Sequence, residues 1–390
     1  MKIIFSVFQP IKNETPQSGV GKIAYQLFSY LEPKYDINIF FSNKGKIKNK
    51  HVKDFGIIFK ILNRIIAFCN RFLPYYIIRH FQEILYDLFL RIHINKTIDI
   101  LISTNAWIPK TAWKAKKWNI KIIFIAGNPN DNYIYNLLKN EKNKLGIKNH
   151  DAFDSNPRLN AFNQFFKNTD IVLCINQYIY ESFIPNDEIS PKYKLIPTIF
   201  DANFKIFDIK KKHSNYFTVF YCAHTTTLKG LQYLLPAFNI FQKNKSNVQL
   251  FIGGTIDKGV FNLISKSLND NIRLLGSLES IQIAEQLKQT SVFVVPSLTD
   301  AAPVTMIEAM YSKTPIICSD GVGHQWLIEE GVNGYLYDKY SIEQLVEKLE
   351  RCYNNIENLQ IMGENARITI DNAIINKRNF NYRFEKLIKR

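Results

Sequence analysis

The sequence predicts an α/β protein built from two doubly wound domains with parallel sheets. Along both halves of the 390-residue chain, short apolar runs rich in β-branched residues alternate with helical or loop segments, which is typical of repeated strand–helix units. The chain is also too long for one ordinary core. A charged and polar stretch, IKKKHSNY (residues 209–216), interrupts the apolar runs. We therefore expect an N-terminal domain over residues 1–208 and a C-terminal domain over residues 209–372.

Composition limits the classes of protein and partner. The formal charge of +16 indicates an anionic partner such as a nucleic acid, an acidic bilayer or a phosphorylated small molecule, or it reflects genomic base bias alone. We expect no nucleic-acid partner, because no recognition module or basic stripe with stacking aromatics is present. Five scattered cysteines without a CxxC pair favour a reducing compartment. The N-terminus is typical of a strand rather than a secretion signal, and no apolar run reaches the ~18 residues of a spanning helix, so we expect a cytoplasmic location.

In the N-terminal domain, five apolar runs predict strands at residues 3–7, 37–41, 98–102, 120–125 and 171–174. After the first strand, SGVGKIAYQLFSYL (residues 18–31) predicts a helix that begins with small residues. Gly19, Val20 and Gly21 would let the backbone approach a ligand at that helix N-terminus. A lone Gly-x-Gly is weak evidence for a ligand site, because a glycine between a strand and a helix is often required only for steric reasons.

Two amphipathic helices are predicted between residues 55 and 95. In the first, Lys60, Arg64 and Arg71 lie with two asparagines on roughly a third of the helix circumference, and apolar residues fill the remainder. That apolar side either packs on the core or lies on an anionic membrane surface, which a purely basic polar face favours. The second helix, after Pro74, has a polar face of both charges, which is typical of a solvated face. We expect that face to carry, among others, Arg79, Glu83 and Asp87, and the core-facing side to carry, among others, Phe81, Ile84 and Leu88.

The loop AGNPNDNYIYN (residues 126–136) follows the strand at residues 120–125. The carboxyl end of a strand is where open α/β sheets bind ligands. Asn128, Asn130 and Asp131 are therefore candidates for contact with a polar substrate. A loop rich in Asn, Pro and Asp is equally explained as a plain turn.

In the C-terminal domain, apolar runs predict strands at residues 217–222, 248–252, 272–275, 292–295 and 315–318. The segment AHTTTLKGL after the first of these places His224 and Lys229 before a helix, where a lysine can neutralise a pyrophosphate. Lys229 alone is also compatible with an ordinary surface lysine. Glycine turns after the next two strands, in FIGGT and LLGS, make a cleft lined by backbone groups more plausible than any one turn does.

The segment from Ser291 to Gly334 holds a strand, a turn, a helix opened by Pro303, and a second strand. Its turn carries Asp300, and its helix carries Glu308. A helix N-terminus offers unpaired N–H groups and partial positive charge, and a carboxylate can accept two ribose hydroxyls. Glu308 is otherwise explained as an exposed charge. The chain contains no Asp-x-Asp pair, and its seven histidines lack ligand spacing, so we expect no catalytic metal.

Five motifs in this order resemble the GT-B retaining glycosyltransferases of family 4, also called glycosyl transferases group 1. They are SGVGKIAYQL, KYKLIPTIFDANF, HTTTLKGLQYLLPAF, VPSLTDAAPVTMIEAM and SDGVGHQWLIEEGVNGYL. The resemblance implies two Rossmann-like domains that face a central cleft. It also implies a C-terminal helix over residues 373–390 that packs back on the N-terminal domain.

The same resemblance implies roles for the candidate residues. Glu308 would bind the nucleotide ribose, Asp300 the donor sugar and Lys229 the diphosphate, and these three residues would be the catalytic ones. The implied donor site is completed by Gly19, Val20, Gly21, His224, Leu275, Ala301, Ala302, Pro303, Val304 and Thr305. The main catalytic effect would be charge stabilisation of the departing phosphate, with no cofactor and no metal.

The implied function is transfer of a sugar, with retained configuration, from a nucleotide-diphosphate sugar to a glycan or lipid-linked acceptor in cell-surface polysaccharide synthesis. UDP or GDP is the expected nucleotide, and the protein is expected to be cytoplasmic or peripheral on the cytosolic face of a membrane. Lys60, Arg64 and Arg71 would contact that membrane.

This sequence departs from the family pattern at four places. Asp300 stands where a Glu is usual, His224 where an Arg is usual and Trp326 where an acidic residue is often found, and AGNPND lacks a histidine that many members carry. These departures motivate an alternative, a catalytically impaired scaffold that binds sugar nucleotides. If His224 contacts the diphosphate, donor binding should weaken as pH rises past the histidine pKa, which is ~6.5 when unperturbed.

Overall fold

The computed structural model describes residues 1–12, 15–16, 19–148, 151–184, 192–198, 204–212, 214–376 and 378–389. Ser18, His150, His213 and residues 199–203, which figured in the motifs and the histidine spacing above, lie outside this set. The chain divides into two compact units. Unit 1 comprises Met1–Asn140, Asn149–Phe200 and Arg378–Arg390, and unit 2 comprises Glu141–Lys148 and Asp201–Lys377.

Within the described ranges, unit 1 is built on a parallel sheet of seven strands in the order β5-β4-β1-β6-β7-β8-β9. The strands are β1 (Lys2–Val7), β4 (Asp36–Phe41), β5 (Val52–Lys53), β6 (Ile100–Ser103), β7 (Lys121–Ala126), β8 (Ile171–Cys174) and β9 (Tyr193–Leu195). A short antiparallel hairpin joins β2 (Ile11–Lys12) to β3 (Thr15–Pro16). The strand order reverses direction between β1 and β6, as in a doubly wound sheet.

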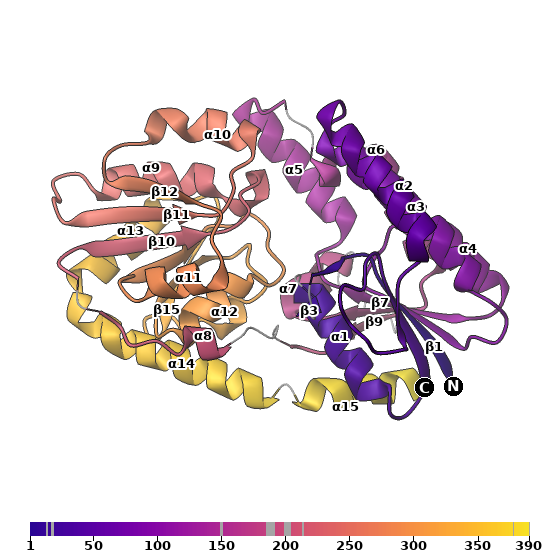
Figure 1. The fold of residues 1–390 in the computed structure, drawn as a ribbon. Coiled ribbons are helices and arrows are strands. Elements are labelled where there is room, and N and C mark those ends of the chain that lie inside the picture. The colour runs from indigo at the N-terminus through magenta and orange to yellow at the C-terminus, as the bar shows by residue number, and fades with distance from the viewer. Residues whose placement is uncertain are drawn as a thin grey trace. The chain divides into compact units, whose positions relative to one another are not determined.

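Helices cover both faces of this sheet (Figure 1). The helices of unit 1 are α1 (Gly19–Leu31), α2 (Gly56–Phe68), α3 (Tyr75–His93), α4 (Pro109–Lys117), α5 (Asp131–Leu145, whose last turns belong to unit 2), α6 (Asn156–Asn168), α7 (Gln177–Phe183) and α15 (Arg378–Lys389). Glu385 of α15 accepts hydrogen bonds from Tyr30 (2.9 Å), Lys34 (2.6 Å) and Tyr35 (3.1 Å). These donors lower the pKa of the Glu385 carboxyl to about 2, the Lys34 bond most of all. The last helix of the chain is therefore an integral part of unit 1.

Unit 2 has a second parallel sheet, of six strands in the described residues, in the order β12-β11-β10-β13-β14-β15. The strands are β10 (Phe217–Cys222), β11 (Val248–Gly253), β12 (Ile272–Gly276), β13 (Val292–Val295), β14 (Ile316–Ser319) and β15 (Gly334–Tyr337). Numbered along the chain, this order is 3-2-1-4-5-6, the arrangement of dinucleotide-binding sheets. Its reversal point lies between β10 and β13, where Phe220 is in register with Phe293.

The helices of unit 2 pack on both sides of its sheet. They are α8 (Phe204–Phe207), α9 (Leu231–Phe241), α10 (Lys258–Ile264), α11 (Ser280–Leu287), α12 (Val304–Tyr311), α13 (Ile342–Asn354) and α14 (Leu359–Asn376). Side chains of α9, α10 and α13 form one apolar core with β10 and β11, whereas α12 packs with α8 and α14. The predicted α/β fold with two parallel sheets is confirmed.

The predicted orientation of α3 is wrong in part, although Leu85 is buried as expected. Glu83 and Asp87, expected to face solvent, are 1% and 3% exposed, whereas Phe81, Ile84 and Leu88 are exposed. The buried carboxylates have charged or polar partners that the sequence does not reveal. Glu83 pairs with Arg79 at 2.9 Å and with Arg158 at 3.4 Å. Asp87 accepts the backbone N–H groups of residues 110 and 111, both at 2.9 Å, in the first turn of α4.

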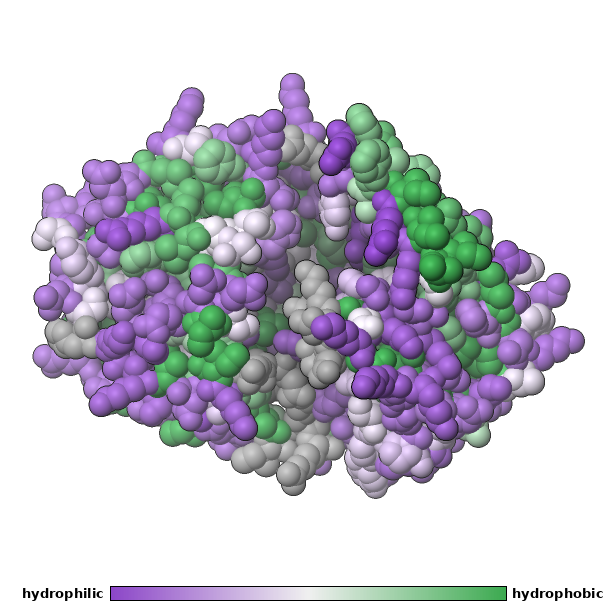
Figure 2. Space-filling view, in the orientation of Figure 1, coloured by the Kyte–Doolittle hydropathy of each residue, from purple (hydrophilic) through white to green (hydrophobic). Residues whose placement is uncertain are grey.

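The neighbouring helix α2 is almost entirely outside the core. Phe59 is its one buried residue among those described, so the structure does not support core packing for the rest of this helix. Together with the outward side of α3, the segment forms an apolar surface that Figure 2 shows as a hydrophobic area. We define this apolar surface by its exposed residues Ile57, Ile58, Ile61, Leu62, Ile65, Phe68, Phe72, Leu73, Tyr75, Phe81, Ile84, Leu88 and Ile92. No helix in the described part of the chain is both long and apolar enough to cross a bilayer.

Candidate functional site

The loops that follow β10 and β13 are joined to each other at the reversal point of the unit 2 sheet. The backbone N–H of Leu298 donates to the carbonyl of Leu228 at 2.8 Å. Gly230, with φ of +73°, lies so close to Pro296 that a Cβ would stand 1.7 Å from the proline carbonyl oxygen. Only glycine fits this position, because an L side chain would meet both the unfavourable φ and the carbonyl. The glycine therefore fixes how the two loops meet.

This arrangement brings Lys229 and Asp300 into an ion pair. The Nζ of Lys229 lies 2.5 Å from Oδ2 of Asp300, and the two side chains are 26% and 15% exposed. Backbone hydrogen bonds hold Asp300 from both sides: its N–H donates to Gly321 at 2.9 Å, and its carbonyl accepts from Gly323 at 2.7 Å. An ammonium group carries three N–H donors. Asp300 therefore orients Lys229 while leaving donors that can reach an anion.

Glu308 lies nearby on α12 and is only 6% exposed, so it is not an ordinary surface charge. The hydroxyl of Thr305, in the first turn of α12, donates to the carbonyl of Cys222 at 3.1 Å and fixes the helix start at the end of β10. Burial, with the negative charge of Glu308 adding to it, raises the pKa of the Cys222 thiol to about 12. Pro303 is the N-cap and supplies no side-chain cap. The N-terminal turn of α12, with its partial positive charge, and Glu308 thus lie beside the loop that carries Lys229.

Of the remaining donor-site candidates in unit 2, His224 lies on the edge of this group and Leu275 lies apart. The His224 side chain is exposed, with Nδ1 2.6 Å from Oγ1 of Thr255 and Nε2 3.7 Å from Oδ1 of Asp257. Leu275 lines a surface hollow with polar side chains of the 279–289 region. Ala301 and Ala302 are buried in the turn after Asp300, and Val304 is half-buried at the start of α12.

His324 is a site residue that the sequence reasoning missed. It is fully buried in the turn after β14, next to Trp326, whose ring is 48% exposed. Burial lowers the pKa of His324 to about 4, although the charge of Asp300 acts in the opposite direction. The imidazole is therefore neutral at pH 7. The sequence shows only that His324 follows a glycine-containing turn; its position near Asp300 depends on the tertiary contacts of Gly321 and Gly323 with Asp300.

The candidates in unit 1 occupy two loops of that unit. Gly19, Val20 and Gly21 form the start of α1, and a Cβ on Gly127 would stand 2.1 Å from a methyl of Val20. The turn that contains Gly127 therefore packs directly on the N-terminal turn of α1.

The loop after β7 is largely a turn with internal contacts. Its Asn130 accepts the backbone N–H of Asn132 at 2.9 Å. Asp131 is buried and accepts the indole N–H of Trp107 at 2.9 Å. Burial raises the pKa of Asp131 to about 6. Among these three candidates for acceptor contact, Asn128 alone is exposed.

Residues 203–369 match the family model described as Glycosyl transferases group 1. One curated relative, alpha-monoglucosyldiacylglycerol synthase of Acholeplasma laidlawii, is 26% identical over 224 residues, which are 53% of this chain and 55% of that protein. The chain spans about half the length of the curated relatives it matches.

Solved structures agree over a longer part of the chain. Sucrose-phosphate synthase from Thermosynechococcus elongatus superposes with a TM-score of 0.70 at 16% identity, covering 100% of this chain and 98% of the other. Anabaena HepE in complex with UDP and glucose superposes with a TM-score of 0.65 at 15% identity, covering 100% and 99%. At 15–16% identity, these similarities show that the fold is shared and nothing more.

The contact at Gly230 generates a prediction about stability. Gly230→Ala should lower the free energy of unfolding by about 2–4 kcal/mol, because the new methyl displaces the Pro296 carbonyl. Gly331→Ala is the matched control: its φ is +76°, but a Cβ there has open space, so its cost should stay near ~1 kcal/mol. Urea unfolding of both variants measures the difference. If both variants lost the same free energy of unfolding, the close contact between Gly230 and Pro296 would not be the cause of the destabilisation.

The burial of His324 generates a prediction about pH. The unfolded chain binds a proton at this histidine near pH ~6.5, whereas the folded chain binds it only near about 4. Stability should therefore fall as pH falls through this window, by up to ~3 kcal/mol from this group. Unfolding of the wild type and of His324→Gln at pH 7.5, 6, 5 and 4 tests this, because glutamine does not titrate. If the stability of the wild type and of His324→Gln changed equally with pH, the buried His324 would not be the neutral, pKa-lowered group described above.

Proposed function

We propose that this chain transfers a sugar from a nucleotide-diphosphate sugar to a glycan or lipid-linked acceptor, because residues 203–369 match the Glycosyl transferases group 1 family model and the chain has the GT-B fold. The observation that carries this proposal is the Lys229–Asp300 pair beside Glu308 and the α12 N-terminus. This group lies at the sheet position where doubly wound domains bind nucleotides.

The proposed roles follow from charge and burial. Lys229, oriented by Asp300, binds the diphosphate, and the first turn of α12 adds partial positive charge. Glu308, buried and at the end of β10, accepts the ribose hydroxyls. Asp300 and the backbone of residues 301–305 contact the donor sugar. His224 contributes at the edge of the site.

In the proposed reaction, the bond between the sugar and the diphosphate breaks while an acceptor hydroxyl attacks from the same face and passes its proton to the leaving diphosphate oxygen, so configuration is retained. The leaving diphosphate gains negative charge, and Lys229 with the helix N-terminus stabilises that charge without a metal. UDP is our first choice of nucleotide, because HepE was solved with UDP and glucose, and GDP is the second. Thermal stabilisation of the purified protein by UDP, GDP and ADP selects the nucleotide.

The assigned roles predict a clear pattern of activity. Lys229→Met should lower kcat by about 100-fold, because it removes the charge opposite the leaving group. Glu308→Gln should weaken donor binding by at least about tenfold. Sugar transfer from the selected donor, measured with and without EDTA, is the assay, and full activity with EDTA is expected.

A control variant is available in the same unit. Lys245→Met removes a lysine that is also paired with a carboxylate, Glu350 at 2.7 Å, and should leave transfer within about twofold of the wild type. Full turnover by Lys229→Met would refute its role. A wild-type protein that binds the donor without turnover would favour the scaffold alternative.

We further propose that the apolar surface on α2 and α3 rests on an anionic membrane that holds a lipid-linked acceptor. Contiguous exposed apolar residues of this extent mark interaction sites. Basic side chains accompany them: Arg64 and Arg71 are exposed, whereas Lys60 is engaged by Asp54 at 2.7 Å. An apolar side with a basic polar side is typical of interfacial helices. The name of the Acholeplasma relative includes a diacylglycerol, which supports a lipid acceptor.

Membrane contact predicts that Arg64→Glu/Arg71→Glu lowers partitioning to vesicles containing phosphatidylglycerol by at least about tenfold. Ile58→Ser/Ile65→Ser should lower partitioning to the same vesicles through loss of apolar contact. Co-sedimentation with vesicles is the measurement. Lys243→Glu/Lys258→Glu, which reverses two exposed charges in unit 2, is the control and should bind much as the wild type does. Unchanged binding by the arginine variant would refute the membrane contact.

A further inference from the structure

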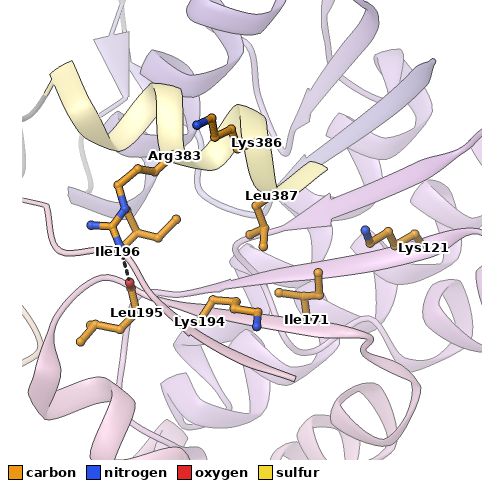
Figure 3. A pocket seen from close by; sticks show the side chains of 8 residues that line it. All are labelled: Lys121, Ile171, Lys194, Leu195, Ile196, Arg383, Lys386 and Leu387. Carbon is orange, nitrogen blue, oxygen red and sulfur yellow. Dashed lines mark hydrogen bonds between the residues drawn. The ribbon is translucent and has the colours of Figure 1, made fainter. Parts of the chain in front are cut away.

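Unit 1 contains a pocket that the proposed transfer reaction does not use. It has a volume of about 440 Å³ and lies between α15 and the strands β7, β8 and β9 (Figure 3). Its lining residues are Lys121, Ile171, Lys194, Leu195, Ile196, Arg383, Lys386 and Leu387. We refer to it as the α15 pocket.

None of the residues assigned to the proposed donor or acceptor lines the α15 pocket. Lys121 and Ile171 are the first residues of β7 and β8, whereas Lys194 and Leu195 end β9 and Ile196 follows it, so the pocket extends along the β7–β9 side of the sheet against α15. Ligands of doubly wound sheets bind at the carboxyl ends, where α1 and the loop after β7 begin. The pocket is therefore a separate site in the same unit.

Four cations surround this pocket, and no carboxylate lines it. Lys121, Lys194, Arg383 and Lys386 have no ion pair with any Asp or Glu in the described part of the chain. Arg383 donates to the carbonyl of Leu195 at 3.2 Å, and the Lys386 ammonium lies 4.6 Å from the Tyr382 ring centroid. An anion in the pocket would therefore lie in a basic environment and be attracted to the lining cations.

The acidic residues of the neighbourhood already have other partners. Glu385 of the same helix binds Tyr30, Lys34 and Tyr35 on unit 1, and it also pairs with Lys389 at 3.0 Å. Asp170, just before β8, binds Lys116 at 2.5 Å and the backbone N–H of residue 122 at 2.8 Å. Neither carboxylate lines the pocket, so the charge of its rim is not neutralised locally.

The middle of the pocket is apolar. Figure 3 shows Leu387 of α15 and Ile171 of β8 on facing sides of the pocket, with Lys121 and Lys194 on the strand side and Arg383 and Lys386 on α15. Leu195 and Ile196 complete the apolar lining. A bare phosphate would leave this apolar part of the pocket unfilled, whereas a phosphate that carries hydrocarbon fits both parts. The volume is within the range of small-molecule sites.

We propose that the α15 pocket binds a phosphate group attached to an apolar chain, such as the headgroup end of an anionic phospholipid. The phosphate contacts the basic rim, and the first carbons of the chain lie against Leu387 and Ile171. This site differs from the apolar surface on α2 and α3, and it requires no sugar transfer.

Calorimetric titration with dihexanoyl phosphatidic acid, kept below its critical micelle concentration, tests this proposal. The wild type should bind it saturably, and Lys194→Gln/Lys386→Gln should weaken binding by at least about tenfold through loss of two charge-assisted contacts. Neither lysine forms an ion pair with an acidic residue in the described ranges, so the variant should fold, and its thermal melting curve checks this. Lys46→Gln/Lys48→Gln, two exposed lysines of the same unit, should bind as the wild type does.

Three comparisons decide the outcome. Dihexanoyl phosphatidylcholine and inorganic phosphate should each bind at least about tenfold more weakly than the phosphatidic acid. If phosphatidylcholine bound as tightly as phosphatidic acid, the basic rim would not contribute to binding. If inorganic phosphate bound as tightly as phosphatidic acid, the apolar part of the pocket would not contribute. Loss of binding in Arg64→Gln/Arg71→Gln, with the pocket variant unaffected, would place the lipid on α2. Each of these results would overturn the proposal.

Discussion

Lys229 and Asp300 meet because β10 and β13 are neighbours in the sheet of unit 2, although 71 residues separate them in the chain. Each residue follows its strand by a few positions, so the pairing of the strands sets the distance between the two loops. Gly230 then allows the loops to touch. If another strand separated β10 from β13, the ammonium and the carboxylate would stand roughly 5 Å farther apart. The charge pattern of the site is thus a consequence of sheet topology.

In both units, ionisable side chains that are largely shielded from solvent either have compensating partners or lose their charge. In unit 1, Glu83 and Asp87 enter the interior because arginines and a helix N-terminus compensate them there. In unit 2, Asp300 is compensated by Lys229, while His324 beside it is neutral because burial lowers its pKa. Buried ionisable groups require such partners or lose their charge. Both sites therefore depend on groups supplied from distant parts of the chain.

The sequence was sufficient to predict ten of the parallel strands and the loops at which candidate residues gather. β5, β9 and β15 were missed because these strands are only two to four residues long and give no recognisable apolar run. β15 also begins with a glycine. Lys229, Asp300 and Glu308 were predicted as one group from their positions after strands and from family motifs. Their ion pair and the neighbour His324 were not, because both depend on tertiary contacts. The reversed orientation of α3 has the same origin: helical periodicity separates two faces but does not tell which one finds partners.

The docking of α15 has a consequence for synthesis of the chain. Phe380, Phe384 and Ile388 are buried, and Glu385 joins three side chains of the first 35 residues. Domains usually fold in the order in which they leave the ribosome. Here the last described strand of unit 2 ends at residue 337, whereas α15 of unit 1 begins only at residue 378. The unit that begins the chain is therefore completed after the unit that follows it.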